Sequence, residues 1–85
     1  MKHFTSPLFW RCYEKLPASV KQLADKKFEL LKNNFRHPSL HLKKAGQYYS
    51  VRVDIRYRAL GVEIQEGILW FWIGIHSQYD ELLRR

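Results

Sequence analysis

The sequence predicts an α+β domain in which an N-terminal α-hairpin packs on a small, mostly antiparallel β-sheet of three or four strands. Two observations support this class. Both helical patterns precede the main strand patterns, and the connections between the later segments are short. Helices that are segregated from an antiparallel sheet in this way are typical of α+β folds. We therefore expect residues 1–85 to form a single domain.

The first helix is expected to begin at Ser6-Pro7, because Ser is a good N-cap and Pro is favoured at the first helical position. Apolar residues follow at helical spacing until Pro17 ends the pattern. A second helix should follow at once and run to Asn33, with one apolar face and a lysine-rich opposite face. Together they form an α-hairpin across residues 7–33.

The second half of the chain has strand patterns separated by turns. Pro38 breaks the helical pattern, after which two leucines alternate with His41 and Lys43, so these two polar side chains are expected on one face. The last pattern is continuously apolar, which predicts an interior strand with helices on one side of the sheet. The expected strands cover residues 40–43, 48–54, 56–63 and 68–75, and residues 2–5 are a candidate edge strand.

Positive charge is concentrated in the first half of the chain. Residues 1–47 hold ten Lys or Arg against three Asp or Glu, and residues 48–85 hold five of each, which gives +7 and 0 and sums to the net +7. This imbalance indicates an anionic partner, meaning nucleic acid, an acidic protein or a membrane surface. The alternative is a solvated basic helix without a partner.

Cysteine and histidine usage excludes several site types. A single cysteine, Cys12, rules out an internal disulfide and a cysteine-based zinc site, and it is expected in the core. The four histidines lack metal-ligand spacing, so neither a metal nor another cofactor is expected. The N-terminus shows no apolar leader, and residues 68–75 are too short to cross a bilayer as a helix. We expect a soluble cytoplasmic protein.

His76 and Tyr79 directly follow the apolar strand. A histidine held by a rigid strand yet close to solvent is suited to proton transfer near neutral pH. Tyr79 is expected to stack on an RNA base or to donate a hydrogen bond to a phosphate. The alternatives are a surface histidine at a strand end and a tyrosine that packs on the sheet with Leu82 and Leu83.

Arginines lie on two successive strands. Arg52 and Arg58 should be near enough for both guanidinium groups to hold one phosphate. Arg56 has the same alternation as Arg58 and is a further candidate for binding the substrate. The alternative is a set of exposed salt bridges from these arginines to Asp54, Glu63 and Glu66.

Basic residues close the segment before these strands. His41 is a candidate general base, since an imidazole is better matched to neutral pH than a lysine. Lys43 and Lys44 are candidates for binding a backbone phosphate. The ordinary interpretation is that all three simply face solvent.

The order of these segments resembles that of the RelE/ParE superfamily of bacterial toxin–antitoxin toxins. The resemblance covers nearly the whole chain and implies the family fold, two helices against a small antiparallel sheet. RelE-like members are ribosome-dependent endoribonucleases that cut mRNA without a metal and are silenced by a cognate antitoxin. The matching segments are Leu16-Pro17 before the lysine-rich helix and residues 37–44, 49–52, 57–60 and 72–79.

The resemblance implies roles for several of the candidate residues. Arg58 matches the position that stabilises the phosphate, and Arg52 matches a basic position on the preceding strand. His76 matches a catalytic position, here the general acid, and Tyr79 matches an aromatic that orients the substrate. His41 resembles the base of the histidine-using members, with Lys43 as the alternative.

The chain also departs from the best-known family pattern. Ser50 stands where some members have lysine, and no arginine lies beside His76. ParE-like members inhibit DNA gyrase and cleave no RNA, and because they share the fold, fold alone does not separate the two branches. An inactive, RNA-binding member is a third alternative.

Overall fold

The computed structural model describes residues 2–83, without the side chains of residues 80, 82 and 83. The predicted packing of Leu82 and Leu83 therefore lies outside the described residues. The elements, in chain order, are β1 (Lys2–Thr5), α1 (Pro7–Glu14), α2 (Ala18–Asn33), the short 3-10 helix η1 (Pro38–Leu40), β2 (Lys43–Ala45), β3 (Tyr48–Arg52), β4 (Tyr57–Ile64), β5 (Gly67–Ile75) and α3 (His76–Leu83).

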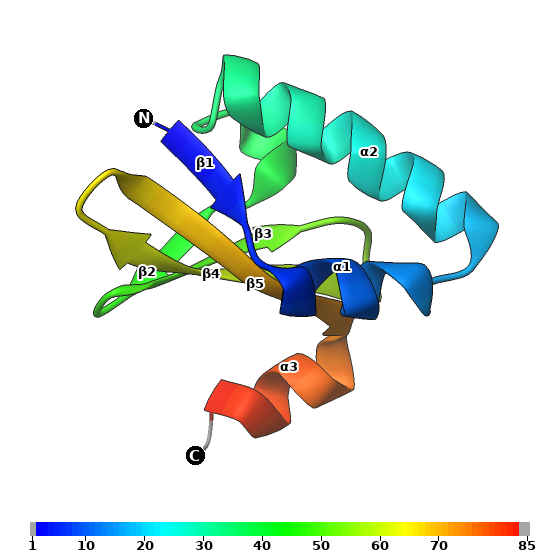
Figure 1. Cartoon of the computed structure of the whole chain (residues 1–85). Helices are drawn as coiled ribbons and strands as arrows, with labels where there is room; N and C mark the ends of the chain where they lie inside the picture. Colours follow the sequence, from blue (N-terminus) through cyan, green and yellow to red (C-terminus); the bar gives the residue numbers. More distant parts are fainter. Residues whose placement is uncertain (1, 84–85) are drawn as a thin grey trace.

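The sheet has five strands in the order β1-β5-β4-β3-β2. β1 pairs in parallel with β5, and the other pairs are antiparallel. The predicted α+β class is confirmed, but the predicted three or four strands become five because residues 2–5 do form the edge strand. In Figure 1, α2 lies above the sheet and α3 below it, so helices lie on both sides rather than on one.

The α-hairpin forms where the sequence predicted it. The Ser6 side chain accepts a hydrogen bond from the Phe9 N–H at 3.2 Å, and Pro7 occupies the first helical position. Pro17 then precedes α2, because its missing N–H is tolerated at a helix start. Asn34 closes α2 through its N–H, which donates to the Leu30 carbonyl at 2.7 Å.

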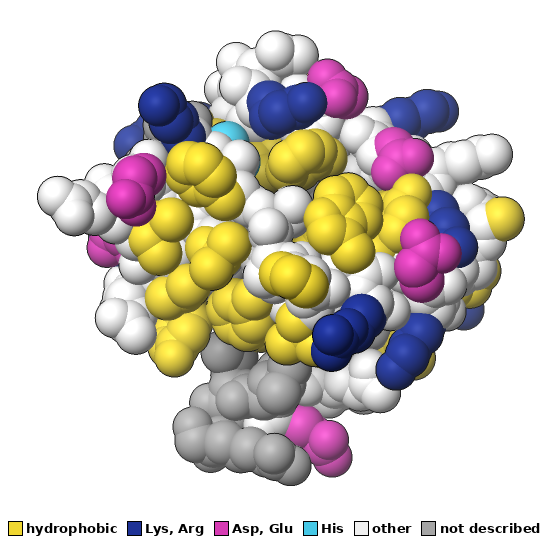
Figure 2. Space-filling model, in the orientation of Figure 1, with side chains coloured by type: hydrophobic (Ala, Val, Ile, Leu, Met, Phe, Trp, Pro, Cys, Tyr) yellow, Lys and Arg dark blue, Asp and Glu magenta, His cyan; other side chains and the backbone are white. Residues whose placement is uncertain are grey.

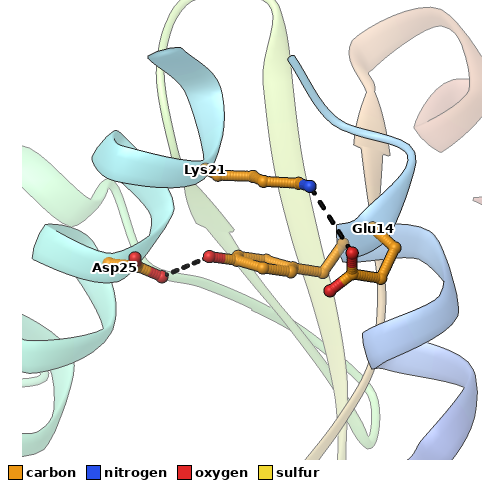
Figure 3. Close-up of polar contacts among 4 residues, drawn as sticks. Glu14, Lys21 and Asp25 are labelled. Atoms are coloured by element: carbon orange, nitrogen blue, oxygen red, sulfur yellow. Dashed lines mark hydrogen bonds and ion pairs between the residues drawn. The ribbon is translucent and has the colours of Figure 1, made fainter. Parts of the chain in front are cut away.

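Polar contacts of Tyr13 tie the two helices of the hairpin together (Figure 3). The Tyr13 hydroxyl donates to the Asp25 carboxylate at 2.8 Å, and this bond raises the pKa of Tyr13. Lys21 forms an ion pair with Glu14 at 3.5 Å and lies 5.7 Å from the centre of the Tyr13 ring. Because the carboxylates of Glu14 and Asp25 are exposed, these contacts contribute to the orientation of the helices more than to stability.

The core lies between the helices and one face of the sheet. Alternation along β3 and just beyond it buries Tyr49, Val51 and Val53 against the helices, as predicted. Trp70 is 2% exposed and is the largest fully buried side chain, so β5 carries the centre of the core. The helices contribute Phe9, Val20, Ala24 and Leu31.

Apolar side chains also remain on the outside, around β1 and α1. Figure 2 shows a broad field of hydrophobic side chains on the side of the molecule that faces the viewer. Phe4, Leu8 and Trp10 are 39%, 50% and 45% exposed. A group of exposed apolar side chains, in contrast to single exposed residues, is typical of an interaction surface.

The predicted strand at residues 40–43 is wrong. Pro38 starts the 3-10 helix instead, Leu40 is fully buried at its end, and His41 adopts a left-handed backbone with φ 46°. β2 begins only at Lys43. The apolar alternation that suggested a strand arises because Leu40 reaches the core from a tight turn.

The last strand lies inside the sheet, as predicted, between β1 and β4. β1 covers only its first part, Gly67–Trp70. A bulge shifts the register against β4, so that Leu60 faces Trp72 while Gly61 faces Trp70. Phe71 is the extra residue, which lets Trp70 and Trp72 lie on opposite faces of the sheet.

His3 on β1 is packed against Trp70. The indole Nε1–H donates to His3 Nδ1 at 3.1 Å, and the ring centroids are 6.2 Å apart. Because Nδ1 accepts, the proton of the neutral ring lies on Nε2, which is buried without a hydrogen-bond partner among the described residues. Burial lowers the pKa of His3 from its ordinary value of 6.5.

We expect the free energy of unfolding to decrease as the pH falls from 6.5 towards the lower pKa of folded His3. In that window the unfolded chain binds a proton that the folded chain does not, which contributes at most about 1.4 kcal/mol per pH unit. Urea unfolding across this range should give a flatter pH dependence for His3→Gln, whose amide oxygen can accept the same indole bond. Equal slopes for the two proteins would contradict this expectation.

Candidate active site

The face of the sheet opposite α1 and α2 carries the two arginines predicted to act together. Arg52 on β3 and Arg58 on β4 are direct Cα partners in the antiparallel ladder. Partner residues project to the same face of a sheet, with Cβ atoms about 5 Å apart. Both side chains are half-buried. Two guanidinium groups therefore start from adjacent points on one surface.

The turn between β3 and β4 holds Arg58. Its guanidinium donates to the backbone carbonyls of Asp54, at 2.8 Å, and Tyr57, at 3.1 Å. The Asp54 carboxylate is itself engaged, since it accepts the N–H groups of Arg56 at 2.7 Å and Tyr57 at 3.1 Å. Two neutral carbonyls fix the position of the guanidinium and leave its charge unneutralised.

The alternative of a salt-bridge ladder is not what the structure contains. Among the described side chains, three ion pairs occur, and none includes Arg52, Arg56 or Arg58. Glu63, one of the expected partners, instead pairs with Lys44 at 3.8 Å. The positive charge of the arginine face is therefore available for an anionic ligand.

His41 lies beside Arg52, although not through the strand geometry that was predicted. Its Nε2 lies 3.3 Å from an Nη1 of Arg52. Arginine only donates, so Nε2 accepts and the proton of the neutral ring lies on Nδ1. The left-handed backbone at His41 brings the imidazole to the arginine pair from outside the sheet.

Tyr79 reaches the same face from α3. Its hydroxyl donates to Ser50 Oγ at 3.2 Å, and Ser50 is 6% exposed. Ser50 precedes Arg52 by two residues on β3, so the two side chains share a face about 7 Å apart. This bond places the phenol of Tyr79 at the arginine face, while the alternative packing with Leu82 and Leu83 involves side chains outside the described part of the chain.

His76 opens α3 at the end of β5. Its backbone N–H donates to the Arg56 carbonyl at 2.6 Å, and its ring lies 5.6 Å from that of Tyr79, between centroids. Tyr57, next to Arg58 on β4, pairs with Ile75, the residue before His76. The structure therefore places His76 at the end of the sheet that carries the arginine pair.

The remaining predicted residues are divided between the two faces. Lys43 is the ladder partner of Ser50 and shares its face. Lys44 is the partner of the core residue Tyr49 and lies 5.4 Å from the centre of its ring, so it projects to the helix side and away from the arginines. Arg56 is exposed in the bend, where its backbone contacts Asp54 and His76.

Ser50 and the covering role of α3 were not identified from the sequence. The departure from lysine at position 50 was noted, but its contact with Tyr79 spans 29 residues of sequence and leaves no local pattern. The signal that existed was a serine between Tyr49 and Val51, two residues that were expected on the buried face.

Hollows in the surface surround this face. One of about 180 Å³ lies between β2, β3 and Tyr79, and its lining includes Lys43 and Ser50. A larger one, of about 510 Å³, lies elsewhere, between the α1–α2 turn, the end of β5 and α3, and its lining includes Cys12 and Trp72. The chemistry-bearing residues do not line that larger hollow, so size alone does not locate the site.

Within the described residues, no group of three or more His, Cys, Asp or Glu side chains is arranged to hold a metal ion. No helix in this part of the chain has the length and apolar character needed to cross a membrane.

The fold is that of a class of solved structures, the RelE, YoeB and ParE toxins of toxin–antitoxin systems. A chain of the RelB–RelE antitoxin–toxin complex from Methanococcus jannaschii matches with a TM-score of 0.74 and 14% identity, over 93% of this chain and 96% of that one. The resemblance predicted from the sequence is thus confirmed at the level of the fold.

Two further solved structures have the same fold. The YoeB/ParE toxin from Agrobacterium tumefaciens matches with a TM-score of 0.69 and 14% identity, over 89% of this chain and 99% of that one. The YoeB–YefM complex from Staphylococcus aureus matches with a TM-score of 0.60 and 23% identity, over 89% and 97%. No protein-family model and no curated protein sequence matches this chain.

Proposed function

We propose that this protein is the toxin of a type II toxin–antitoxin system and that it cleaves mRNA on the ribosome. The observation that supports this most strongly is the pairing of Arg52 and Arg58 on one face, with His41 in contact with one of them. Two cations and an imidazole beside one another are suited to a phosphodiester whose charge increases as the reaction proceeds.

The proposed reaction is attack by a ribose 2′-hydroxyl on the adjacent phosphorus. A new O2′–P bond forms, the P–O5′ bond breaks, and the products are a 2′,3′-cyclic phosphate and a 5′-hydroxyl. The base removes the 2′-hydroxyl proton, and an acid returns a proton to the leaving O5′. Arg52 and Arg58 bind the non-bridging oxygens, where negative charge develops in the transition state.

His41 is the proposed base, and Lys43 is the alternative. The Nε2 lone pair of His41 accepts a hydrogen bond from Arg52. When a phosphate binds Arg52, the guanidinium turns to it and this lone pair becomes free to accept the 2′-hydroxyl proton. Lys43 lies on the same face, opposite Ser50, and contributes positive charge.

His76 is the proposed acid, and Tyr79 is proposed to orient the substrate. The backbone bond from His76 to the Arg56 carbonyl fixes the start of α3 on the end of the sheet. The phenol of Tyr79 exchanges its bond to Ser50 for one to the phosphate or stacks on a base. In this proposal the two residues act on the leaving-group side of the phosphate.

An antitoxin is the proposed protein partner, and the cytoplasm is the proposed location. Two of the matched structures are toxin–antitoxin complexes. The net charge of +7 favours an acidic partner, and the exposed Phe4, Leu8 and Trp10 provide apolar area for it. The ribosome, an RNA-rich surface, is the second proposed partner of this basic chain.

Controlled expression in a bacterial host tests the proposed function. Protein synthesis should stop and primer extension should show new 5′ ends within mRNA, while plasmid supercoiling stays normal. His76→Ala and Arg58→Ala should relieve the arrest, whereas Arg11→Ala, on the exposed side of α1, should not. Intact mRNA with failing supercoiling would replace the proposal by gyrase inhibition, the alternative shared by this fold.

A further inference from the structure

A hollow continues the candidate active site beyond Arg52. It has a volume of about 270 Å³ and is lined by Arg36, His37, Pro38, His41 and Leu42. His41 belongs to both places, because its Nε2 also lies 3.3 Å from Arg52. Among the described residues that line the hollow, none carries a carboxylate. The hollow is therefore a cationic and imidazole-rich extension of the arginine face.

The backbone around this hollow is held in an unusual shape. Pro38 restricts His37 to an extended conformation, with φ −57° and ψ 132°. The 3-10 helix then ends at His41 in a left-handed conformation, which costs a residue other than glycine about 1–2 kcal/mol. Leu40 is fully buried and anchors the turn. Such strain is maintained only where the surrounding structure compensates for it.

Hydrogen bonds fix the His37 ring within this shape. The Ser39 N–H donates to His37 Nδ1 at 3.2 Å, and Ser39 Oγ lies 3.0 Å from the same atom. With Nδ1 as the acceptor, the proton of the neutral ring lies on Nε2. Lys27 of α2 donates to the Ser39 carbonyl at 3.3 Å and ties the turn to the helix. The ring is thus presented as a donor.

Arg36 carries the formal positive charge of the hollow. Its guanidinium lies over the Phe35 ring, 5.1 Å from the centroid, which leaves its N–H edges for other partners. None of the ion pairs among the described side chains includes Arg36. A guanidinium, two imidazoles and the apolar surfaces of Pro38 and Leu42 match the phosphate and the ribose of one nucleotide.

We infer that Arg36, His37 and His41 form a second phosphate subsite, which binds a phosphate of the RNA next to the scissile one. This inference rests on the proposed function, because it takes RNA as the ligand. The subsite sets the register of the strand, so that the phosphate one position away reaches Arg52 and Arg58. Arg36 and His37 are positioning residues in this arrangement and take no part in proton transfer.

Binding of an uncleavable RNA tests the subsite apart from catalysis. The probe is a short, fluorescently labelled oligoribonucleotide with 2′-O-methyl groups, followed by anisotropy at several salt concentrations. Arg36→Gln should weaken binding about 3- to 10-fold and lower the slope of log K against log salt by about 0.7. Lys26→Gln, which removes the same charge from an exposed position on α2, should change binding by less than about twofold.

Replacing single phosphates by uncharged methylphosphonates locates the contact. One substitution next to the scissile position should weaken binding to the wild type and have no effect on Arg36→Gln, because the partner of that phosphate is already lost. The subsite is overturned if the wild type does not bind, if Arg36→Gln binds as tightly as the wild type, or if every substitution affects both proteins equally.

Cleavage of unmodified mRNA on programmed ribosomes separates this inference from the proposed function. Arg36→Gln should lower kcat/KM several-fold, mainly through a higher KM, with a smaller loss in kcat from strands that bind out of register. If the wild type cleaves mRNA and Arg36→Gln cleaves it equally well, the subsite is ruled out and the proposed function stands. If the wild type binds RNA through Arg36 but does not cleave it, the nuclease activity is ruled out and the subsite stands.

Discussion

Replacing Arg58 by Gln is expected to lower the rate of mRNA cleavage about 100- to 1000-fold, the loss typical for a group that stabilises transition-state charge. Arg58 is held by the carbonyls of Asp54 and Tyr57 and has no carboxylate partner among the described side chains. Its charge is therefore available for the phosphate. Rates from single-turnover cleavage on programmed ribosomes provide the measurement.

Gln is preferred to Ala for this variant because its amide can still donate to the Asp54 carbonyl and retain the turn. Thermal unfolding should show that Arg58→Gln remains folded at the assay temperature. Arg11→Gln is the matched control, because this arginine is exposed on α1, a helix that packs on the other face. A full cleavage rate in Arg58→Gln would contradict the role given to this residue.

Replacing Gly67 by Ala should destabilise the fold by about 3 kcal/mol, because it combines backbone strain with a steric clash. Gly67 has φ +153°, and an added Cβ would lie 2.1 Å from the backbone carbonyl oxygen of Lys2. The clash is with backbone, so it can be relieved only by moving β1 away from β5. Urea unfolding followed by far-UV circular dichroism measures this loss.

Gly46→Ala is the control for the strain alone. Gly46 also has a positive φ, of +62°, but no atom lies within 4 Å of the added Cβ. It should lose only about 1–2 kcal/mol, the ordinary cost of a left-handed residue. Equal losses of unfolding free energy in the two variants would show that the clash with Lys2 adds nothing to the backbone strain at Gly67. That result would contradict the close approach of β1 to this glycine.

Local rules account for the parts of the fold that the sequence predicted well. Ser6, Pro7 and Pro17 each affect only the helical turn next to them, so the hairpin could be predicted from neighbouring residues alone. Alternation along β3 likewise identified the face, with Tyr49 and Val51, that joins the hydrophobic core. The parallel pairing of β1 with β5 was not predictable in this way, because the two strands are more than 60 residues apart and β1 has only four residues.

The candidate site also has one part that local rules predicted and another part that they did not. Arg52 and Arg58 were expected together because a short turn joins their strands, and they are ladder partners. His41 was expected on a strand and instead reaches Arg52 from a left-handed turn, because burial of Leu40 outweighed the strand pattern. Lys43 and Lys44 are adjacent lysines that the sequence alone does not distinguish. Lys44 lies on the other face, because the register of β2 decides which lysine faces the arginines.

The central claim is that Arg52 and Arg58 bind the same phosphate, and a double-mutant cycle of cleavage rates tests it most directly. Arg52→Gln, Arg58→Gln and the double variant are compared with the wild type under single-turnover conditions. If both guanidinium groups bind one phosphate, the double variant should lose far less than the product of the two single losses. Losses that simply multiply would mean that the two arginines act independently and would contradict the account.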